Sequence, residues 1–192
     1  MSDLQPLKYP IYKGMGGKQG AVQFTYRPPH FFCTEDRKHK FFSGETVRTA
    51  SFNRDTPCPR EGCNGTLMSR DGCVFLDISS AVGKNKYDWK NKIMIQLSIK
   101  DLGQLLVGLG TGKNVSIIHD PGAGTDNKGQ VVKTLSFSSP KGLGEGGFLS
   151  CSMSSGRDKE KVEHRVGMTA DEIIVLRELL KSVIPKALAW EN

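Results

Sequence analysis

The side chains with the most informative chemistry lie close together in residues 83–92. Four lysines in this stretch surround Tyr87 and Trp89: Lys84, Lys86, Lys90 and Lys92. Lysine ammonium groups neutralise phosphates, and aromatic faces stack on bases of any sequence. This mixture therefore predicts contacts with single-stranded nucleic acid rather than with a duplex. The alternative is a polar hairpin in which Trp89 plugs the core and the lysines are only solvated.

Two further groups of basic residues lie on or beside predicted strands. The first follows a glycine-rich segment and consists of Lys13, Lys18 and Arg27. The second lies in the C-terminal half and consists of Lys133, Lys159, Lys161 and Arg165. Phe24 and Tyr26 share one face of the strand that leads to Arg27, because alternate strand residues point the same way. That face is either a stacking surface or, for Phe24 especially, part of the core.

The cysteine spacing is compatible with a zinc site. Cys58 and Cys63 are spaced like half of such a site, and His30 with Cys33 could supply the other half. Thiols are also often buried simply as small apolar groups. The sequence leaves both alternatives open, and our main expectation is a protein without a bound metal or cofactor.

No combination of residues suggests an active site. His119 is followed by Asp120, but no nucleophile, base and orienting group recur in a motif. The glycine-rich segment 108–113 follows a helix, whereas a phosphate-binding loop must precede one. We therefore expect no catalytic residues and no small-molecule substrate, and we predict that the protein is not an enzyme.

The distribution of charge favours a polyanionic partner. The 192 residues include 27 Lys and Arg against 20 Asp and Glu, which gives a formal net charge of +7. The excess lies in residues 1–54, 82–113 and 128–168, whereas residues 171–192 are slightly acidic. No apolar run approaches the roughly 20 residues of a membrane span, so we expect no membrane partner. Five cysteines, an odd number, fit a reducing compartment better than a disulfide framework.

Short apolar or alternating runs predict seven strands, most of them bounded by Gly, Pro, Asn or Asp. Two of them alternate clearly, which indicates antiparallel strands with one solvent-facing side. The seven runs are residues 21–26, 73–79, 93–97, 115–118, 131–137, 148–153 and 162–166.

The first of two amphipathic helices is predicted over about residues 99–109. Ser98 and Asp101 stand close to the relation of a capping box at its start. Leucines at helical spacing form its apolar face: Leu102, Leu105, Leu106 and Leu109.

The second helix is predicted to begin at Thr169, with Glu172 as its capping partner. Pro185 has no amide hydrogen, so we expect the helix to kink or break there. One stripe of the helix is apolar and consists of Ile173, Leu176, Leu180, Val183 and Ala187.

The two helices match one another in caps and apolar positions at an offset of 71 residues. Each also follows a group of strands, so the chain repeats the order strands, then helix. We therefore predict an α+β fold in one domain, residues 1–192, made of two halves at about 12–110 and 114–190. The alternative is that any two well-capped amphipathic helices align this well.

Several short motifs follow one another along the chain: Tyr87-Asp88-Trp89 with Lys92, Leu97-Ser98, Leu102-Gly103, His119-Asp120-Pro121-Gly122, Gly129, Lys133, Ile184-Pro185 and Ala189-Trp190. Their order and spacing resemble the Whirly family of plant organelles and its kinetoplastid relatives, the mitochondrial guide-RNA-binding proteins. The likeness covers roughly residues 13–190. The segment 34–64 is longer than in the plant pattern and favours the kinetoplastid branch.

The resemblance implies a Whirly-like fold of two roughly perpendicular four-stranded antiparallel sheets, each followed by a helix. It also implies that C-terminal helices pack into a tetramer, with the apolar stripe of the second helix as the oligomer interface. The tetramer would be a heterotetramer with a paralogue or a homotetramer.

For function, the resemblance implies binding of single-stranded RNA, namely guide RNA and messenger RNA. The sheet face would neutralise phosphates, leave bases free to pair and so promote annealing during mitochondrial RNA editing. No targeting peptide is visible in the chain, so the mitochondrial location follows from the resemblance alone. The alternatives are a single-stranded DNA-binding Whirly-type organelle factor and, in another class, a structural or assembly subunit of a ribonucleoprotein.

Overall fold

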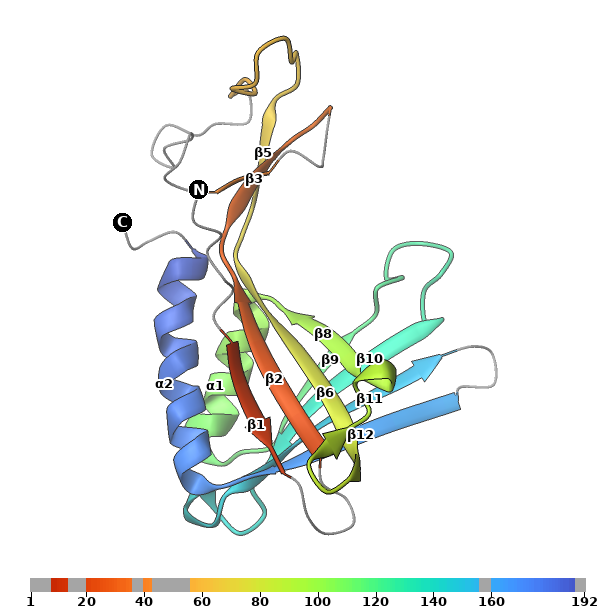
Figure 1. Cartoon of the computed structure of the whole chain (residues 1–192), viewed down its shortest axis with the longest axis vertical. Helices are drawn as coiled ribbons and strands as arrows, with labels where there is room; N and C mark the ends of the chain where they lie inside the picture. Colours follow the sequence, from red (N-terminus) through yellow and green to blue (C-terminus); the bar gives the residue numbers. More distant parts are fainter. Residues whose placement is uncertain (1–7, 14–19, 36–39, 43–55, 156–159, 189–192) are drawn as a thin grey trace.

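A computed structural model describes residues 8–13, 20–35, 40–42, 56–155 and 160–188. Two antiparallel sheets and two helices make up the body of the molecule, and a third, small sheet projects from it (Figure 1). Among the described residues no helix is both long enough and apolar enough to cross a membrane.

The first sheet is built on the long strand β6, which pairs with β2 along one edge and with β8 and β7 along the other. β1 pairs with the outer edge of β2. The strands are β1 (Lys8–Tyr12), β2 (Gly20–Arg27), β6 (Cys73–Gly83), β7 (Lys86–Tyr87) and β8 (Ile93–Leu97). A single 3-10 turn, η2 (Trp89–Asn91), joins β7 to β8, and helix α1 (Ile99–Thr111) follows β8.

The second sheet has the order β12-β11-β10-β9, with every neighbouring pair antiparallel. Its strands are β9 (Val115–His119), β10 (Val131–Ser138), β11 (Gly147–Ser155) and β12 (Glu160–Met168), with the 3-10 turn η3 (Leu143–Glu145) before β11. Helix α2 (Ala170–Ala187) follows β12. In Figure 1 the strands of this sheet cross those of the first.

The third sheet contains three short strands in the order β4-β3-β5. They are β3 (His30–Cys33), β4 (Lys40–Phe42) and β5 (Leu67–Arg70). Figure 1 shows β3 and β5 extending beyond the ends of β2 and β6, away from both helices and from the second sheet.

One apolar core joins both large sheets and both helices. In the first sheet, alternate residues of β6 point into it, because Val74, Leu76 and Ile78 are buried while Phe75 and Asp77 are only half-buried. Gly20 lies where the two sheets meet, and its surroundings leave no space for a side chain there. A Cβ there would lie 2.2 Å from the carbonyl oxygen of Ser79 and 3.2 Å from that of Arg165.

Both helices begin as the sequence predicts. Ser98 and Asp101 form a complete capping box at α1, and Thr169 and Glu172 form one at α2. Pro185 does not end α2, which continues to Ala187. Of the expected kink or break, the break is therefore wrong, because a proline in the last turn removes only one of the final hydrogen bonds, and the kink stays a prediction.

The apolar stripe of α2 packs inside the chain's own core, which corrects the expectation that it faces sister subunits. Four of its members are at most 2% exposed and Val183 packs against the same core; the four are Ile173, Leu176, Leu180 and Ala187. The two sheets leave an apolar face that the helices must cover, and this stripe covers it. A different apolar set on α2 is exposed: Ile174, Val175 and Leu179.

The predicted α+β fold, with two antiparallel sheets each followed by a helix, is confirmed, and all seven predicted strands and both helices are present. Two details differ from the expectation. The first sheet has five strands rather than four, because the two-residue strand β7 adds to its edge, and the small third sheet was not predicted. The internal duplication and the two-half domain description stay predictions.

Candidate nucleic-acid interface

Three aromatic side chains lie in a row at the end of the first sheet where β1 and β6 finish. The rings of Tyr12 and Tyr87 are 5.4 Å apart between centroids and tilted by 35°. The rings of Tyr87 and Trp89 are 6.3 Å apart and tilted by 56°. Tyr12 is 52% exposed and the other two are half-buried, so all three reach the surface. We call Tyr12, Tyr87 and Trp89 the aromatic row.

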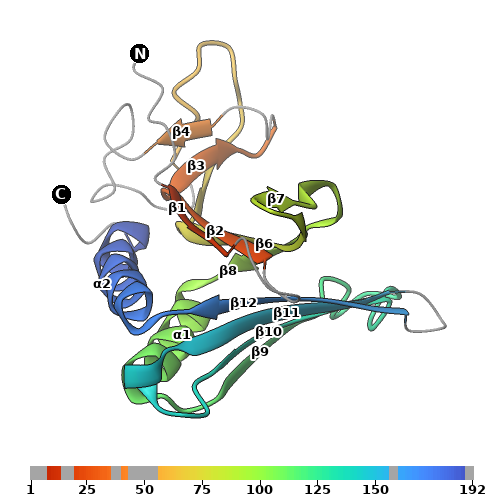
Figure 2. The same ribbon diagram turned by 60° about the horizontal axis from the view of Figure 1, so that its bottom comes forward.

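Exposed lysines lie close to Tyr87 and Trp89 in the chain. Lys84 lies in the two-residue turn between β6 and β7, Lys86 begins β7, and Lys90 lies in η2. The turn is tight because Asn85 adopts a positive φ of 55°, a conformation that asparagine tolerates better than most residues. Figure 2 shows this hairpin on the side of the molecule away from α2. Three of the lysines that the sequence predicts to contact nucleic acid thus lie on the same hairpin and turn as Tyr87, which carries the same prediction.

Hydrogen bonds from both sheets hold the aromatic row in place. The amide of Asp88 donates to the carbonyl of Ser80 over 3.0 Å. His164 of β12 is only 6% exposed; its Nδ1 lies 2.7 Å from the hydroxyl of Ser80 and its Nε2 lies 2.9 Å from the carbonyl oxygen of Asn91. Because this buried imidazole ties β6 and η2 to the second sheet, the row sits on a rigid junction.

Three other predicted lysines form ion pairs. Lys13 Nζ lies 2.8 Å from Glu172 of α2, so this lysine turns towards the helix. Lys92 Nζ lies 2.8 Å from Asp77. Lys161 pairs with a carboxylate of its own strand, Glu163, at 3.2 Å, and both groups are about half exposed, so that pair is weak.

The two predicted arginines pack against aromatic rings. The Cζ of Arg27 is 5.9 Å from the centroid of Phe75, and that of Arg165 is 3.8 Å from the centroid of Phe148. Arg165 is exposed whereas its neighbours His164 and Val166 are buried, so it points away from the core on the outer face of the second sheet.

Lys133 lies on the opposite, inner face of the second sheet, where its Nζ donates to the carbonyl oxygen of Met94 over 2.7 Å. It therefore links β10 to the edge strand β8. Beside it is a pocket of about 450 Å³ between these elements, lined by Phe75, Met94, Ile95, Gln96, Ser98, His119, Asp120, Pro121 and Lys133.

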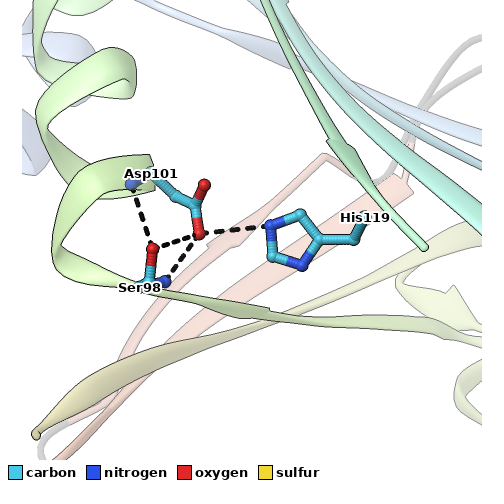
Figure 3. Close-up of polar contacts among 3 residues, drawn as sticks. All are labelled: Ser98, Asp101 and His119. Carbon is cyan, nitrogen blue, oxygen red and sulfur yellow. Dashed lines mark hydrogen bonds and ion pairs between the residues drawn. The ribbon is translucent and has the colours of Figure 1, made fainter. Parts of the chain in front are cut away.

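His119 and Asp101 form a clasp between β9 and the start of α1 (Figure 3). One carboxylate oxygen of Asp101 accepts from the amide of Ser98 over 2.8 Å and from its hydroxyl over 2.7 Å, and it lies 3.1 Å from Nε2 of His119. Asp120, the next residue, accepts from the amides of Gly122 and Gly129, each over 2.9 Å, and closes the loop between β9 and β10. The histidine and both carboxylates thus serve the fold.

Replacing Asp101 by alanine should lower the free energy of unfolding by about 1–2 kcal/mol, since it removes the helix cap and the clasp together. Thermal unfolding should then occur about 2–8 °C lower for a domain of this size. Lys100→Ala, next to it in α1 and exposed, is the matched control and should leave the melting temperature unchanged. Equal melting temperatures for both variants would contradict the structural role of the clasp.

Cys151 on β11 is fully buried, and its burial raises the pKa of the thiol to about 12. A thiol with such a pKa stays protonated at neutral pH and is not a nucleophile.

Several residues that the sequence marks as candidates for binding are in the core, are not brought together, or lie outside the described residues. Phe24 is in the core rather than on a stacking surface. Lys18 and Lys159 lie outside the described residues. Of the four candidate zinc ligands, the structure brings together the cysteines, Cys33, Cys58 and Cys63, but not His30. His30 and Cys33 are three apart on β3 and so point to opposite faces of that strand.

Sequence reasoning missed two residues of the interface, Tyr12 and His164. Tyr12 lies on β1, which was not among the predicted strands, and only the pairing of β1 with β2 brings its ring beside that of Tyr87. Nothing in the sequence pairs His164 with Ser80, 84 residues away.

Comparisons with known proteins place the chain in a family. The family model described as Whirly transcription factor matches residues 53–179. The mitochondrial single-stranded DNA-binding protein WHY2 of Arabidopsis thaliana is 30% identical over 125 residues, 65% of this chain and 52% of that protein. The chloroplastic single-stranded DNA-binding protein WHY1 of Zea mays is 26% identical over 184 residues, 96% of this chain and 57% of that protein. The chain thus spans about half the length of these curated relatives.

Solved structures agree with this fold. The crystal structure of WHY1 from Arabidopsis thaliana superposes with a TM-score of 0.69 and 24% identity, covering 96% of this chain and 86% of that one. The plant transcriptional regulator PBF-2 gives a TM-score of 0.68 and 26% identity, covering 96% and 84%. With a family model that matches residues 53–179 and these two sheets, each followed by a helix, the chain belongs to the Whirly family.

Proposed function

We propose that this protein binds single-stranded DNA without sequence preference, as a non-catalytic factor of an organelle. The observation that carries the proposal is the aromatic row at the end of the first sheet, with exposed lysines close to Tyr87 and Trp89 in the chain. Bases would stack on the rings of Tyr12 and Tyr87, and Lys84, Lys86 and Lys90 would neutralise the neighbouring phosphates.

This geometry favours single strands because the base faces of a duplex are already stacked on one another. In a duplex only the base edges are accessible, in the grooves, and aromatic rings that stack on base faces cannot use them. Arg27, at the other end of β2, and Arg165, on the outer face of the second sheet, are also exposed, although each is engaged with a ring.

The names of the plant relatives favour DNA over RNA as the ligand. Guide RNA and messenger RNA, with annealing during RNA editing in a kinetoplast mitochondrion, are the other ligand class that the sequence resemblance implies. Relatives named as mitochondrial and as chloroplastic both occur, so we propose an organelle and, within that, the mitochondrion.

For assembly, we propose a tetramer in which the exposed apolar residues of α2 contact sister subunits. Ile174, Val175 and Leu179 are 52%, 44% and 39% exposed and lie on the side of the helix away from its buried stripe. Association would remove these side chains from water. Whether the sisters are identical copies or a paralogue, the same helix face would be used.

Fluorescence anisotropy with labelled oligonucleotides tests the proposal. Single-stranded DNA should bind more tightly than a duplex of the same sequence. The logarithm of its association constant should fall with the logarithm of salt concentration with a slope near −0.7 per phosphate contact, or about −2 for three lysines.

Equal affinity for duplex, or a response flat in salt, would contradict the proposed interface. The same assay with RNA of identical sequence compares the two ligand classes. Tighter binding of RNA would favour the guide-RNA alternative over DNA.

A further inference from the structure

Three cysteine thiols meet at the outer end of the small sheet, away from the two main sheets. The sulfur atoms of Cys33, Cys58 and Cys63 all lie within 4.8 Å of one another, and those of Cys33 and Cys63 are 3.3 Å apart. Cys33 ends β3, whereas the other two come from the loop before β5, so the cluster joins segments 25 to 30 residues apart in sequence. Cys33 and Cys58 are buried and Cys63 is half-buried.

These separations suit a tetrahedral zinc ion. Zinc binds thiolate sulfur at about 2.3 Å, so two thiolates on one ion are about 3.8 Å apart. The Cys33–Cys63 separation of 3.3 Å is slightly below that value and no pair is more than 4.8 Å apart, so small side-chain rotations would bring the three sulfurs to it. A fourth ligand is at hand, because the carboxylate of Glu35 lies 3.4 Å from the sulfur of Cys63.

The backbone around the cluster directs the thiols inward. The amide of Cys63 donates to the carbonyl of Arg60 over 3.2 Å, and Gly62 takes a positive φ of 75°, so the chain turns back towards β3. The amide of Cys58 donates to Gly65 over 2.9 Å. A side chain at Gly65 would come within 2.5 Å of the Cys33 sulfur, so this glycine leaves the space that the thiol occupies.

Among the described residues, few apolar side chains are buried in the small sheet. The cluster that they form is separate from the main core and, in the part of the chain that the structure describes, contains Phe31, Cys33, Cys58 and Leu67, with Cys63 packed at the margin. So few apolar side chains bury little surface, and small folded units of this kind commonly depend on a disulfide or a structural metal. Half of this cluster consists of side chains that zinc prefers.

We propose that Cys33, Cys58 and Cys63 bind one structural zinc ion, with the Glu35 carboxylate as fourth ligand. The three thiols give up their protons on binding, and the ion fixes β3 to the loop before β5. A Cys33–Cys63 disulfide is the competing arrangement, but it would leave Cys58 unpaired in a cluster where three sulfurs converge. This site is independent of the aromatic row and of the proposed binding of DNA.

Elemental analysis of the full chain, purified with zinc in the growth medium and without chelators, should give about one zinc per chain. Cys58→Ser should reduce this to about 0.1 or less, and Glu35→Ala should weaken retention without abolishing it. Cys73→Ser is the matched control, because Cys73 is a buried cysteine of β6 outside the cluster, and it should keep full stoichiometry. Metal-free wild-type protein with three free thiols in the cluster, or with a Cys33–Cys63 disulfide, would overturn the proposal.

Two measurements on the wild-type chain avoid any folding defect of the cysteine variant. Cobalt(II) in place of zinc should give the intense thiolate charge-transfer and tetrahedral d–d absorption bands. Removing the metal should speed hydrogen exchange about tenfold or more at the amides of Thr34, Cys58 and Leu67, which bond across the small sheet and its loop, while the main sheets keep their protection. Absent cobalt bands, or exchange unchanged by metal removal, would equally reject the site.

Discussion

Replacing Lys84, Lys86 and Lys90 together by glutamine should weaken binding of single-stranded DNA about 100-fold at 0.1 M salt, because each lost phosphate contact costs about 5-fold there. The salt slope should also become flatter by about 2. All three side chains are exposed and none belongs to the core, so the melting temperature should change little. Anisotropy titrations at several salt concentrations measure both effects.

The matched control is the triple replacement of Lys100, Lys113 and Lys186 by glutamine. These lysines are also exposed but lie on or next to the helices, and the change in net charge is the same. If the control loses as much affinity as the hairpin variant, binding depends on total charge, and the aromatic row is not the site. A hairpin variant that binds as tightly as wild type would contradict the interface directly.

The strands that sequence reasoning located are those with one buried face. β8 and β9 begin where their apolar runs begin, because every second residue of a strand with one buried face must be apolar. The small sheet was missed for the same reason. Three of the four residues of β5 are exposed, so Leu67 alone gives no alternation, and β3 follows two prolines.

The candidate site could be predicted only in part, because charge pairing is a tertiary property. Lys13 and Glu172 are 159 residues apart, and nothing local to either shows that they meet. Lys84 and Lys86 were easier, since a tight turn at the end of a strand must carry its polar side chains outwards. The helical spacing of apolar residues likewise revealed the apolar face of α2, but not whether that face packs in the chain's own core or against another subunit.

Substitutions on the two faces of α2 should have large and different effects. Leu176→Ala should lower the free energy of unfolding by about 2–5 kcal/mol, because the side chain is 1% exposed in the core and its removal leaves a cavity. Thermal unfolding should then occur about 10 °C lower, at every protein concentration. Circular dichroism melts measure the loss.

Leu179→Glu, three residues along the same helix, is the partner experiment. Leu179 is 39% exposed, so the substitution leaves the core intact, but it places a charge on the face proposed to contact sister subunits. Native mass spectrometry should show the assembly dissociating to smaller species, while the released subunits stay folded. If instead Leu176→Ala dissociates the assembly without loss of stability, the buried stripe is the interface after all. The two variants thus separate a helix face that holds the subunit together from one that holds subunits to each other.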